Sequence, residues 1–140
     1  MIENALLLDS TIAAYALGGN DARRDACRSM MQRAAAGEIR AYASVEMIQE
    51  LVHHRLRISG NRMDSAADGR DVMASCTVLN FDREILDLSL DLIDKHPTVR
   101  GRDAVHAATA IAYGIERIAS TDRAFDDIPG ITRIDPLDFA

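Results

Sequence analysis

The sequence is poor in the residues that build zinc and redox sites. It has only two cysteines in 140 residues, no tryptophan and three prolines. Cys27 and Cys76 lie far apart, without the Cys-x-x-Cys spacing of metal and redox motifs, so we expect two buried, unreactive thiols in a reducing compartment. There is no cysteine–histidine cluster of the kind that holds zinc. There is also no GxxxxGK[ST] loop, so binding of a nucleoside triphosphate is not indicated.

Long hydrophobic runs are also missing. No apolar stretch approaches the roughly 20 residues that a membrane-spanning helix needs. The first residues carry no basic segment before their short apolar run, unlike a secretory signal peptide. We therefore expect a cytoplasmic protein with no membrane partner. Hydrophobic residues make up 48% and charged residues 27% of the chain, which favours a single globular domain over residues 1–140.

Positive charge is scarce, and almost all of it is arginine. The net charge of −6 argues against broad electrostatic binding of nucleic acid. It does not exclude a nucleic-acid enzyme, because carboxylates that bind metal make the metal-free chain look more acidic than the working site. Lys95 is the only lysine. Arginine can hold phosphate with two hydrogen bonds, although high genomic GC content produces the same bias and is the larger cause.

What the chain does contain is a regular alternation of short apolar runs and longer amphipathic segments. Strands are predicted over 5–8, 39–44, 77–81, 117–121 and 131–134. Helices are predicted over 11–17, 21–36, 45–58, 64–76, 83–96 and 103–114, with one helical turn over 122–125. Strands separated by helices are typical of βαβ units, so we predict an α/β domain with a central parallel sheet of four to five strands and helices on both faces.

Acidic residues stand where such a sheet binds its ligands, outside the carboxyl ends of the strands. Asp9 follows the first strand and Asp122 the fourth, while Asp103 opens the helix that leads into the fourth strand. Glu50 lies in the helix after the second strand, on a polar side shared with Glu46, His53 and Arg57. The opposite side of that helix carries an apolar stripe of Val45, Ile48, Val52 and Leu56, which Met47, Leu51 and Ile58 widen. Glu46 is one turn before Glu50 and is an alternative to it.

Each acid also has a simpler interpretation. Aspartate is a preferred N-cap, so Asp9, Asp103 and Asp122 could each cap a helix, and a lone Glu50 is ordinarily a solvated residue. Carboxylates that converge on one edge repel one another, however, and a hard divalent cation offsets that repulsion. Mg²⁺ and Mn²⁺ prefer carboxylate oxygen and water and suit the hydrolysis of phosphoesters. The four acids together therefore predict a metal-dependent phosphoesterase.

The segments LLLDST, SVEMIQEL, GRDAVHAATA and STDRAFDDIPGI, taken in this order, resemble the PIN-domain family, in particular the VapC-type ribonuclease toxins of bacterial toxin–antitoxin pairs. The resemblance runs from Leu6 to about Ile134. It implies a three-layer PIN-like fold and an endoribonuclease that uses Mg²⁺, for which Mn²⁺ can substitute. It also implies RNA as substrate, a homodimer, and a cognate antitoxin that inserts into the active-site groove. The catalytic and metal-binding residues it implies are Asp9, Glu50, Asp103 and Asp122, with Asp126 and Thr121 matching further positions near the metal.

Several other side chains are candidates for supporting roles. His53, Arg57 and Arg102 could contact RNA phosphates, with ordinary pairing along the helix as the alternative. His106 is one turn after Asp103, and we interpret it as a hydrogen-bonded histidine rather than a general acid or base. Ala107 and Ala110 share the side of Asp103 and would let that helix pack close to the sheet.

Other functions fit the sequence less well. An aspartyl phosphatase of haloacid-dehalogenase type needs an acid two residues after its nucleophile, where this chain has Thr11. A receiver-like module needs an acidic pair near the first strand and a lysine after a late strand, whereas Lys95 ends a helix. Two alternatives stay open within the PIN family: an RNA-processing nuclease outside a toxin pair, and a catalytically silent scaffold.

Overall fold

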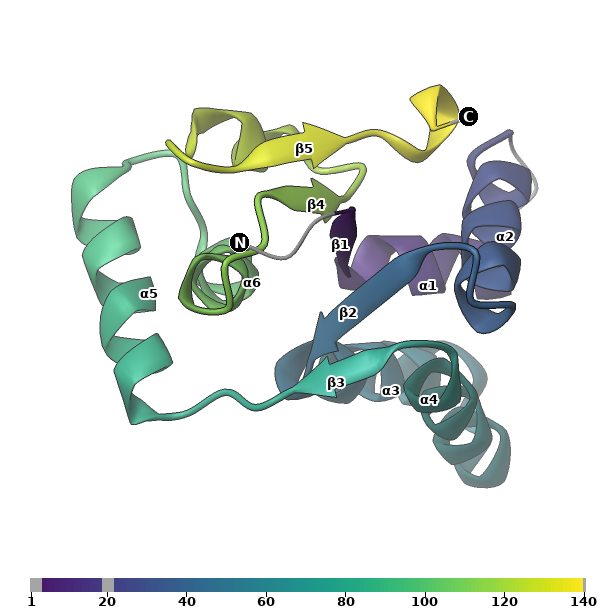
Figure 1. Ribbon diagram of the computed structural model, residues 1–140. Helices are drawn as coiled ribbons and strands as arrows, with labels where there is room; N and C mark the ends of the chain where they lie inside the picture. Colours follow the sequence, from purple (N-terminus) through teal and green to yellow (C-terminus); the bar gives the residue numbers. More distant parts are fainter. Residues whose placement is uncertain (1–3, 19–21, 140) are drawn as a thin grey trace.

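The computed structural model describes residues 4–18 and 22–139. The strands are β1 (Ala5–Leu8), β2 (Arg40–Ser44), β3 (Thr77–Leu79), β4 (Arg117–Ala119) and β5 (Thr132–Ile134). The helices are α1 (Ser10–Leu17), α2 (Ala22–Ala35), α3 (Val45–Ser59), α4 (Arg62–Ser75), α5 (Arg83–Lys95) and α6 (Gly101–Ala112), with 3₁₀ turns η1 (Arg123–Asp127) and η2 (Pro136–Asp138). The strands form one parallel sheet in the order β3-β2-β1-β4-β5 (Figure 1).

The central strand β1 is buried on both faces, as its continuous apolar sequence requires. Successive strand residues point to opposite faces. Leu7 accordingly joins a core cluster with residues of α5 and α6. Leu6 and Leu8 join the cluster on the other face, which residues of α1 to α4 complete. The predicted parallel sheet with helices on both faces is thus confirmed.

Small residues let α6 lie against the sheet. Ala104, Ala107, Ala108 and Ala110 are all completely buried, and their short side chains keep the backbone of the helix close to the sheet beneath it. The predicted close packing through Ala107 and Ala110 is confirmed. This packing carries Asp103 and His106, on the same helix, into the interior.

The chain order creates a switch point at the carboxyl ends of β1 and β4. From β1 the chain builds outward through β2 to β3, and it then returns to the other side of β1 to form β4 and β5. Loops that leave neighbouring strands in opposite directions open a crevice in sheets of this kind. Asp9 follows β1 and Ser120 follows β4, so both residues lie at this crevice.

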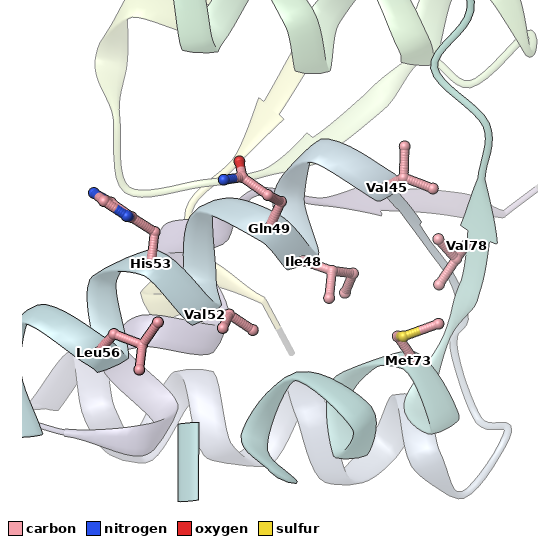
Figure 2. Close-up of a pocket in the computed structure, with 8 residues that line it drawn as sticks. All are labelled: Val45, Ile48, Gln49, Val52, His53, Leu56, Met73 and Val78. Atoms are coloured by element: carbon pink, nitrogen blue, oxygen red, sulfur yellow. The ribbon is translucent and has the colours of Figure 1, made fainter. Parts of the chain in front are cut away.

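The apolar side predicted for α3 is divided between the core and an open groove. The buried residues of α3 are Met47 and Leu51, whereas Val45 is 37% exposed. Ile48, Val52 and Leu56 line an open apolar groove of about 430 Å³, together with Val45, Gln49, His53, Met73 and Val78 (Figure 2). Helical periodicity finds the apolar side of α3 but does not tell which part of it the core covers.

Gly69 explains how α4 approaches α3. A Cβ atom at Gly69 would lie 2.6 Å from Cγ2 of Val52, so a larger residue would require Val52 or its helix to shift. Tertiary packing therefore outweighs the low helix propensity of glycine at this position.

Both cysteines are thiols and form no disulfide in the described part of the chain. Cys27 is buried and Cys76 is partly buried, and burial raises the pKa of Cys76 to about 11. A thiol with such a pKa carries very little thiolate at neutral pH, so Cys76 is a weak nucleophile. Within residues 4–18 and 22–139, no helix combines the length and the apolar character needed to span a membrane.

Candidate active site

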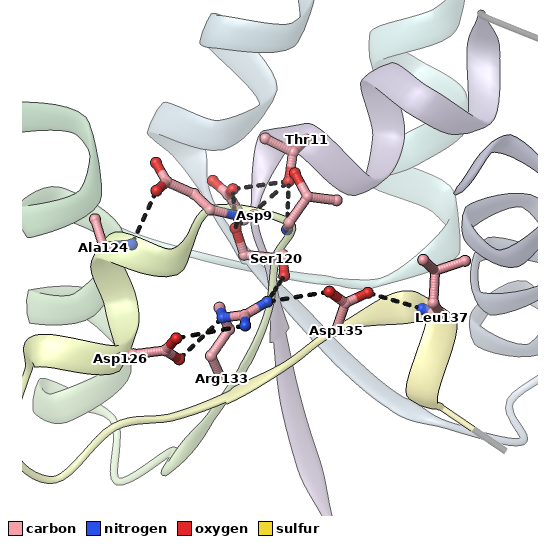
Figure 3. A network of polar contacts seen from close by, with 10 residues as sticks. Asp9, Thr11, Ser120, Ala124, Asp126, Arg133, Asp135 and Leu137 are labelled. Atoms are coloured by element: carbon pink, nitrogen blue, oxygen red, sulfur yellow. Dashed lines mark hydrogen bonds and ion pairs between the residues drawn. The ribbon is translucent and has the colours of Figure 1, made fainter. Parts of the chain in front are cut away.

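Asp9 occupies the N-cap position of α1 but does not cap it. Its carboxylate makes no capping hydrogen bond, and the residue is only 4% exposed. Its Oδ2 instead accepts hydrogen bonds from Ser120 Oγ at 2.6 Å and Thr11 Oγ1 at 2.9 Å (Figure 3). Two hydroxyl groups therefore fix the orientation of Asp9, and the capping interpretation does not account for it.

Asp103 is also not a cap. The helix α6 begins at Gly101, two residues earlier than predicted, and its N-cap is Arg100. Asp103 is 6% exposed, and its buried Oδ2 has no hydrogen-bond partner among the described residues. Burial, the nearby charges of Asp122 and Asp9, and a hydrogen bond with Asp122 raise the pKa of Asp103 to about 7, against the lowering effect of His106. A buried carboxylate oxygen without a donor is costly, and a bound cation would offset that cost.

Asp122 is both a helix cap and a member of the acidic cluster. Its Oδ1 accepts a hydrogen bond from the backbone N–H of Ala124 at 2.9 Å and so caps η1. Its own backbone N–H donates to Ser120 Oγ at 2.9 Å, and its carboxyl group hydrogen-bonds with that of Asp103. The cap fixes the side chain in place while leaving it in contact with the buried aspartate.

Glu50 reaches the same region from α3. Its Oε1 lies 2.8 Å from His106 Nε2, and its Oε2 accepts a hydrogen bond from Ser10 Oγ at 3.3 Å. The guanidinium of Arg102 is 4.0 Å from Oε2 on the solvent side. Glu50 is thus turned inward, which favours it over Glu46 as the acid of this helix that joins the site.

His106 connects these acids from inside the protein. The residue is fully buried, with Nδ1 3.2 Å from Ser44 Oγ and Nε2 3.6 Å from Asp9 Oδ1. Burial lowers the pKa of His106, but the hydrogen bond to Glu50 and the charges of Asp9, Glu50 and Asp103 outweigh it, and the pKa lies above its ordinary value. His106 is a hydrogen-bonded histidine, as predicted.

Two of the further candidates have other partners. Asp126 binds Arg133, with Oδ1 2.9 Å from Nε and Oδ2 3.4 Å from Nη2 (Figure 3). Thr121 contributes its backbone N–H, which donates to Thr11 Oγ1 at 3.3 Å, whereas the hydroxyls on Asp9 belong to Ser120 and Thr11. The reason is register: β4 ends at Ala119, so Ser120 is the first residue at the crevice.

Four hydroxyl residues at the site were not predicted: Ser10, Thr11 and Ser120, which donate to the acids, and Ser44, which contacts His106. Hydroxyl side chains directly after β1, at the end of β2 and after β4 were the available signal. Serine and threonine are common at helix starts, however, so their positions alone do not separate these roles from capping. Ser44 does both, because its Oγ also accepts from the backbone N–H of Met47 and caps α3.

The donor set fits a hard divalent cation. Within the described residues no three acidic, histidine or cysteine side chains already surround one point as a complete metal site. Mg²⁺ does not need such a cage, because it keeps several waters and commonly uses one or two carboxylates. The unpartnered Oδ2 of Asp103, beside Asp122 and Asp9, is an oxygen donor of this type.

A polar groove of about 450 Å³ lies beside Glu50, between α3 and α6. It is lined by Glu46, Gln49, Glu50, His53, His54, Arg57, Gly101, Arg102 and Val105. The three residues predicted to contact phosphate, His53, Arg57 and Arg102, are all among them. Basic side chains therefore line a path that ends at an acidic residue of the site.

The chain resembles known proteins over most of its length. The family model for the PIN domain matches residues 6–131. "Ribonuclease VapC7" of Mycobacterium tuberculosis is 35% identical over 134 residues, covering 94% of this chain and 91% of that protein. The fold matches DNA-bound VapBC from Salmonella typhimurium with a TM-score of 0.73 at 18% identity, covering 94% of this chain and 98% of the other. It also matches VapC20 of Mycobacterium tuberculosis, a sarcin–ricin loop cleaving toxin, with a TM-score of 0.69 at 16% identity, covering 84% and 90%.

Proposed function

Because the chain belongs to the PIN-domain family, we propose that it is a metal-dependent endoribonuclease and the toxin of a toxin–antitoxin pair. The observation that carries the proposal is the buried, unpartnered carboxylate oxygen of Asp103 beside Asp9 and Asp122. Its position at the carboxyl edge of the sheet is where ligands of such folds bind. The 35% identical relative, which is named a ribonuclease, supports RNA as the substrate.

In this proposal Asp9, Glu50, Asp103 and Asp122 hold Mg²⁺, for which Mn²⁺ can substitute. When bound, the ion would neutralise phosphate charge and lower the pKa of a water molecule. Asp126 and Thr121 are left out of the ligand set, because Asp126 is paired with Arg133 and Thr121 faces Thr11 through its backbone.

The chain's own residues position the acids and the substrate. Ser120 and Thr11 orient Asp9, and the cap on η1 fixes Asp122. His53, Arg57 and Arg102 bind the phosphates of the RNA strand in the polar groove. Arginine suits this role because its guanidinium pairs with phosphate oxygens through two parallel hydrogen bonds.

The proposed partners are a cognate antitoxin and a second copy of the chain, acting in the cytoplasm. The support is that solved neighbours of the same fold are toxin–antitoxin complexes, including one from Klebsiella pneumoniae. A nuclease that works outside such a pair would share the site but would have no antitoxin to inhibit it. A catalytically silent scaffold would bind RNA without cleaving it.

The test is RNA cleavage by the purified protein. We expect cleavage with Mg²⁺ or Mn²⁺ that stops with EDTA, and loss of at least about 100-fold in Asp9→Asn and Asp103→Asn, since even residues behind metal ligands typically contribute 10- to 100-fold. Asp87→Asn, an exposed aspartate on α5, is the matched control and should cleave like the wild type. Folded Asp103→Asn protein that cleaves at the wild-type rate would refute the assignment.

A further inference from the structure

We propose that His106 is a positioning residue that holds the Glu50 carboxylate at the metal site from inside the protein. The inference rests on the proposed function, because it assigns Glu50 a role toward the metal. It adds a residue that the four acids do not include and gives it a specific task. The juxtaposition that carries it is a fully buried imidazole with one nitrogen on Ser44 and the other on Glu50.

The ring of His106 is fixed at one end by a rigid anchor. Ser44 is the last residue of β2 and is completely buried. Its Oγ accepts the backbone N–H of Met47 at 3.0 Å, and the same atom lies 3.2 Å from His106 Nδ1. The anchor is therefore tied to both the sheet and the start of α3. With Nδ1 held there, Nε2 points into the site, 2.8 Å from Glu50 Oε1 and 3.6 Å from Asp9 Oδ1.

Glu50 needs such a support more than the aspartates do. A glutamate side chain has more rotatable bonds than an aspartate, so more rotamer freedom must be lost to fix it. Glu50 lines the polar groove and also has Arg102 4.0 Å away on the solvent side. His106 at 2.8 Å and Ser10 at 3.3 Å pull its two oxygens inward. Asp9 already has two hydroxyl donors of its own.

The position of His106 separates this role from direct catalysis. The side chain is 0% exposed, so it does not touch an RNA strand in the groove. It acts through Glu50, as a group behind a metal ligand does when it fixes that ligand's orientation. Nε2 has no hydrogen bond of good geometry among the described residues, and its charged neighbours are Glu50 Oε1 at 2.8 Å and Asp9 Oδ1 at 3.6 Å.

Two amide variants separate the role from simple packing. Glutamine places its side-chain N–H₂ near the position of Nε2, whereas asparagine places it near that of Nδ1. His106→Gln should keep the contact with Glu50, and its Mn²⁺ affinity, measured by calorimetry, should stay within about threefold of wild type. His106→Asn should lose at least about tenfold, the lower end of the effect of groups behind metal ligands. Circular dichroism and thermal melting of the metal-free proteins establish that each variant is folded.

A double-variant cycle tests whether the effect passes through Glu50. In a Glu50→Gln background, His106→Asn should cause little further loss of Mn²⁺ affinity, because coupled residues are not additive. Glu46→Gln is the matched background, in which His106→Asn should keep its full effect. Equal Mn²⁺ affinities of the two amide variants, or full additivity with Glu50→Gln, would overturn the proposal.

A spectroscopic readout does not depend on the His106 variants folding. In ¹⁵N-labelled metal-free protein the Nε2–H resonance of His106 should shift in Glu50→Gln and stay unchanged in Glu46→Gln. An unchanged resonance in both would overturn the proposal. If the wild type binds Mn²⁺ and cleaves RNA while these tests fail, the inference alone is wrong. If the wild type does neither, the proposed function fails and the inference fails with it.

Discussion

Ser120 lies between two groups of acidic side chains, and the two groups are neutralised differently (Figure 3). Its backbone carbonyl accepts a hydrogen bond from Arg133 Nη1 at 3.1 Å, and that guanidinium also lies 2.9 Å from Asp126 and 3.3 Å from Asp135. Its hydroxyl, on the other side, donates to the Asp9 carboxylate and accepts from the backbone N–H of Asp122. There no arginine is paired with Asp9, Asp103 or Asp122 among the contacts of the described residues, and one oxygen of Asp103 is unpartnered.

The difference indicates which acidic group would need a bound cation to neutralise it. Hydrogen bonds with Asp126 raise the pKa of Arg133, so its guanidinium stays positively charged. It neutralises Asp126 and Asp135, and this outer group needs no further cation. The inner group has His106, which contacts Asp9 and Glu50, and the exposed Arg102, which lies 4.0 Å from Glu50. Acids with a fixed arginine form a structural ion cluster, whereas buried acids without one are candidates for binding a cation.

The largest expected effect concerns stability in the absence of metal. Asp103 has a pKa of about 7 in the folded protein, against an ordinary value of 3.8. The unfolded chain therefore releases its proton first as pH rises, and the stability contributed by this residue falls between about pH 4 and pH 7. One pKa unit corresponds to about 1.4 kcal/mol, so the loss is at most a few kcal/mol.

Chemical denaturation of metal-free protein across that pH range measures this loss. Asp103→Asn should show a distinctly smaller fall than wild type, which separates Asp103 from the other titrating groups. Adding Mg²⁺ at pH 7 should raise the wild-type stability and leave Asp103→Asn nearly unchanged. Identical pH profiles for the two proteins would contradict the account of the inner group.

The next effect distinguishes two adjacent hydroxyl residues. Ser120→Ala removes the 2.6 Å hydrogen bond to Asp9 and leaves the backbone N–H of Asp122 without its acceptor. RNA cleavage should fall about 10- to 100-fold, as for other groups that orient metal ligands. Thr121→Ala keeps the backbone N–H through which Thr121 contacts Thr11, so it should cleave within about twofold of wild type. A reversed order in the cleavage assay would mean that Thr121, not Ser120, supports the site.

The smallest effect on activity is expected in the outer group. Asp126→Asn removes one partner of Arg133 but leaves Asp135 and the Ser120 carbonyl in place. Because Asp126 is half exposed, the stability cost should be about 1 kcal/mol or less, with cleavage within about twofold of wild type. Urea denaturation and the same cleavage assay measure both quantities. A loss of activity as large as that of Asp103→Asn would place Asp126 in the inner group.

Much of the fold was predictable, because the signal was repeated along the chain. Each strand is a short apolar run and each helix an amphipathic or alanine-rich segment, so errors at the ends did not change the topology. The start of α6 was placed two residues late, since Gly101 and Arg102 add no apolar periodicity. That small error mattered, because it made Asp103 look like a cap when Arg100 holds that position.

The site was less predictable, because contacts between distant residues decide it. The positions of Asp9 and Asp122 after strands indicated their place at the sheet edge. Whether Ser120 or Thr121 faces Asp9 depends on where β4 ends, and whether Asp126 is free depends on Arg133 in the next strand. The link from Ser44 through His106 to Glu50 joins residues 62 and 56 positions apart, and no local pattern reports it.

Calorimetric titration of Mn²⁺ into three proteins tests the central claim most directly: wild type, Asp126→Asn and Asp103→Asn. The contrast between the two acidic groups predicts saturable binding by wild type and by Asp126→Asn with similar affinity. It predicts loss of most of that affinity in Asp103→Asn, with folding verified by thermal melting. Equal Mn²⁺ binding by all three proteins, or no binding by the wild type, would contradict it.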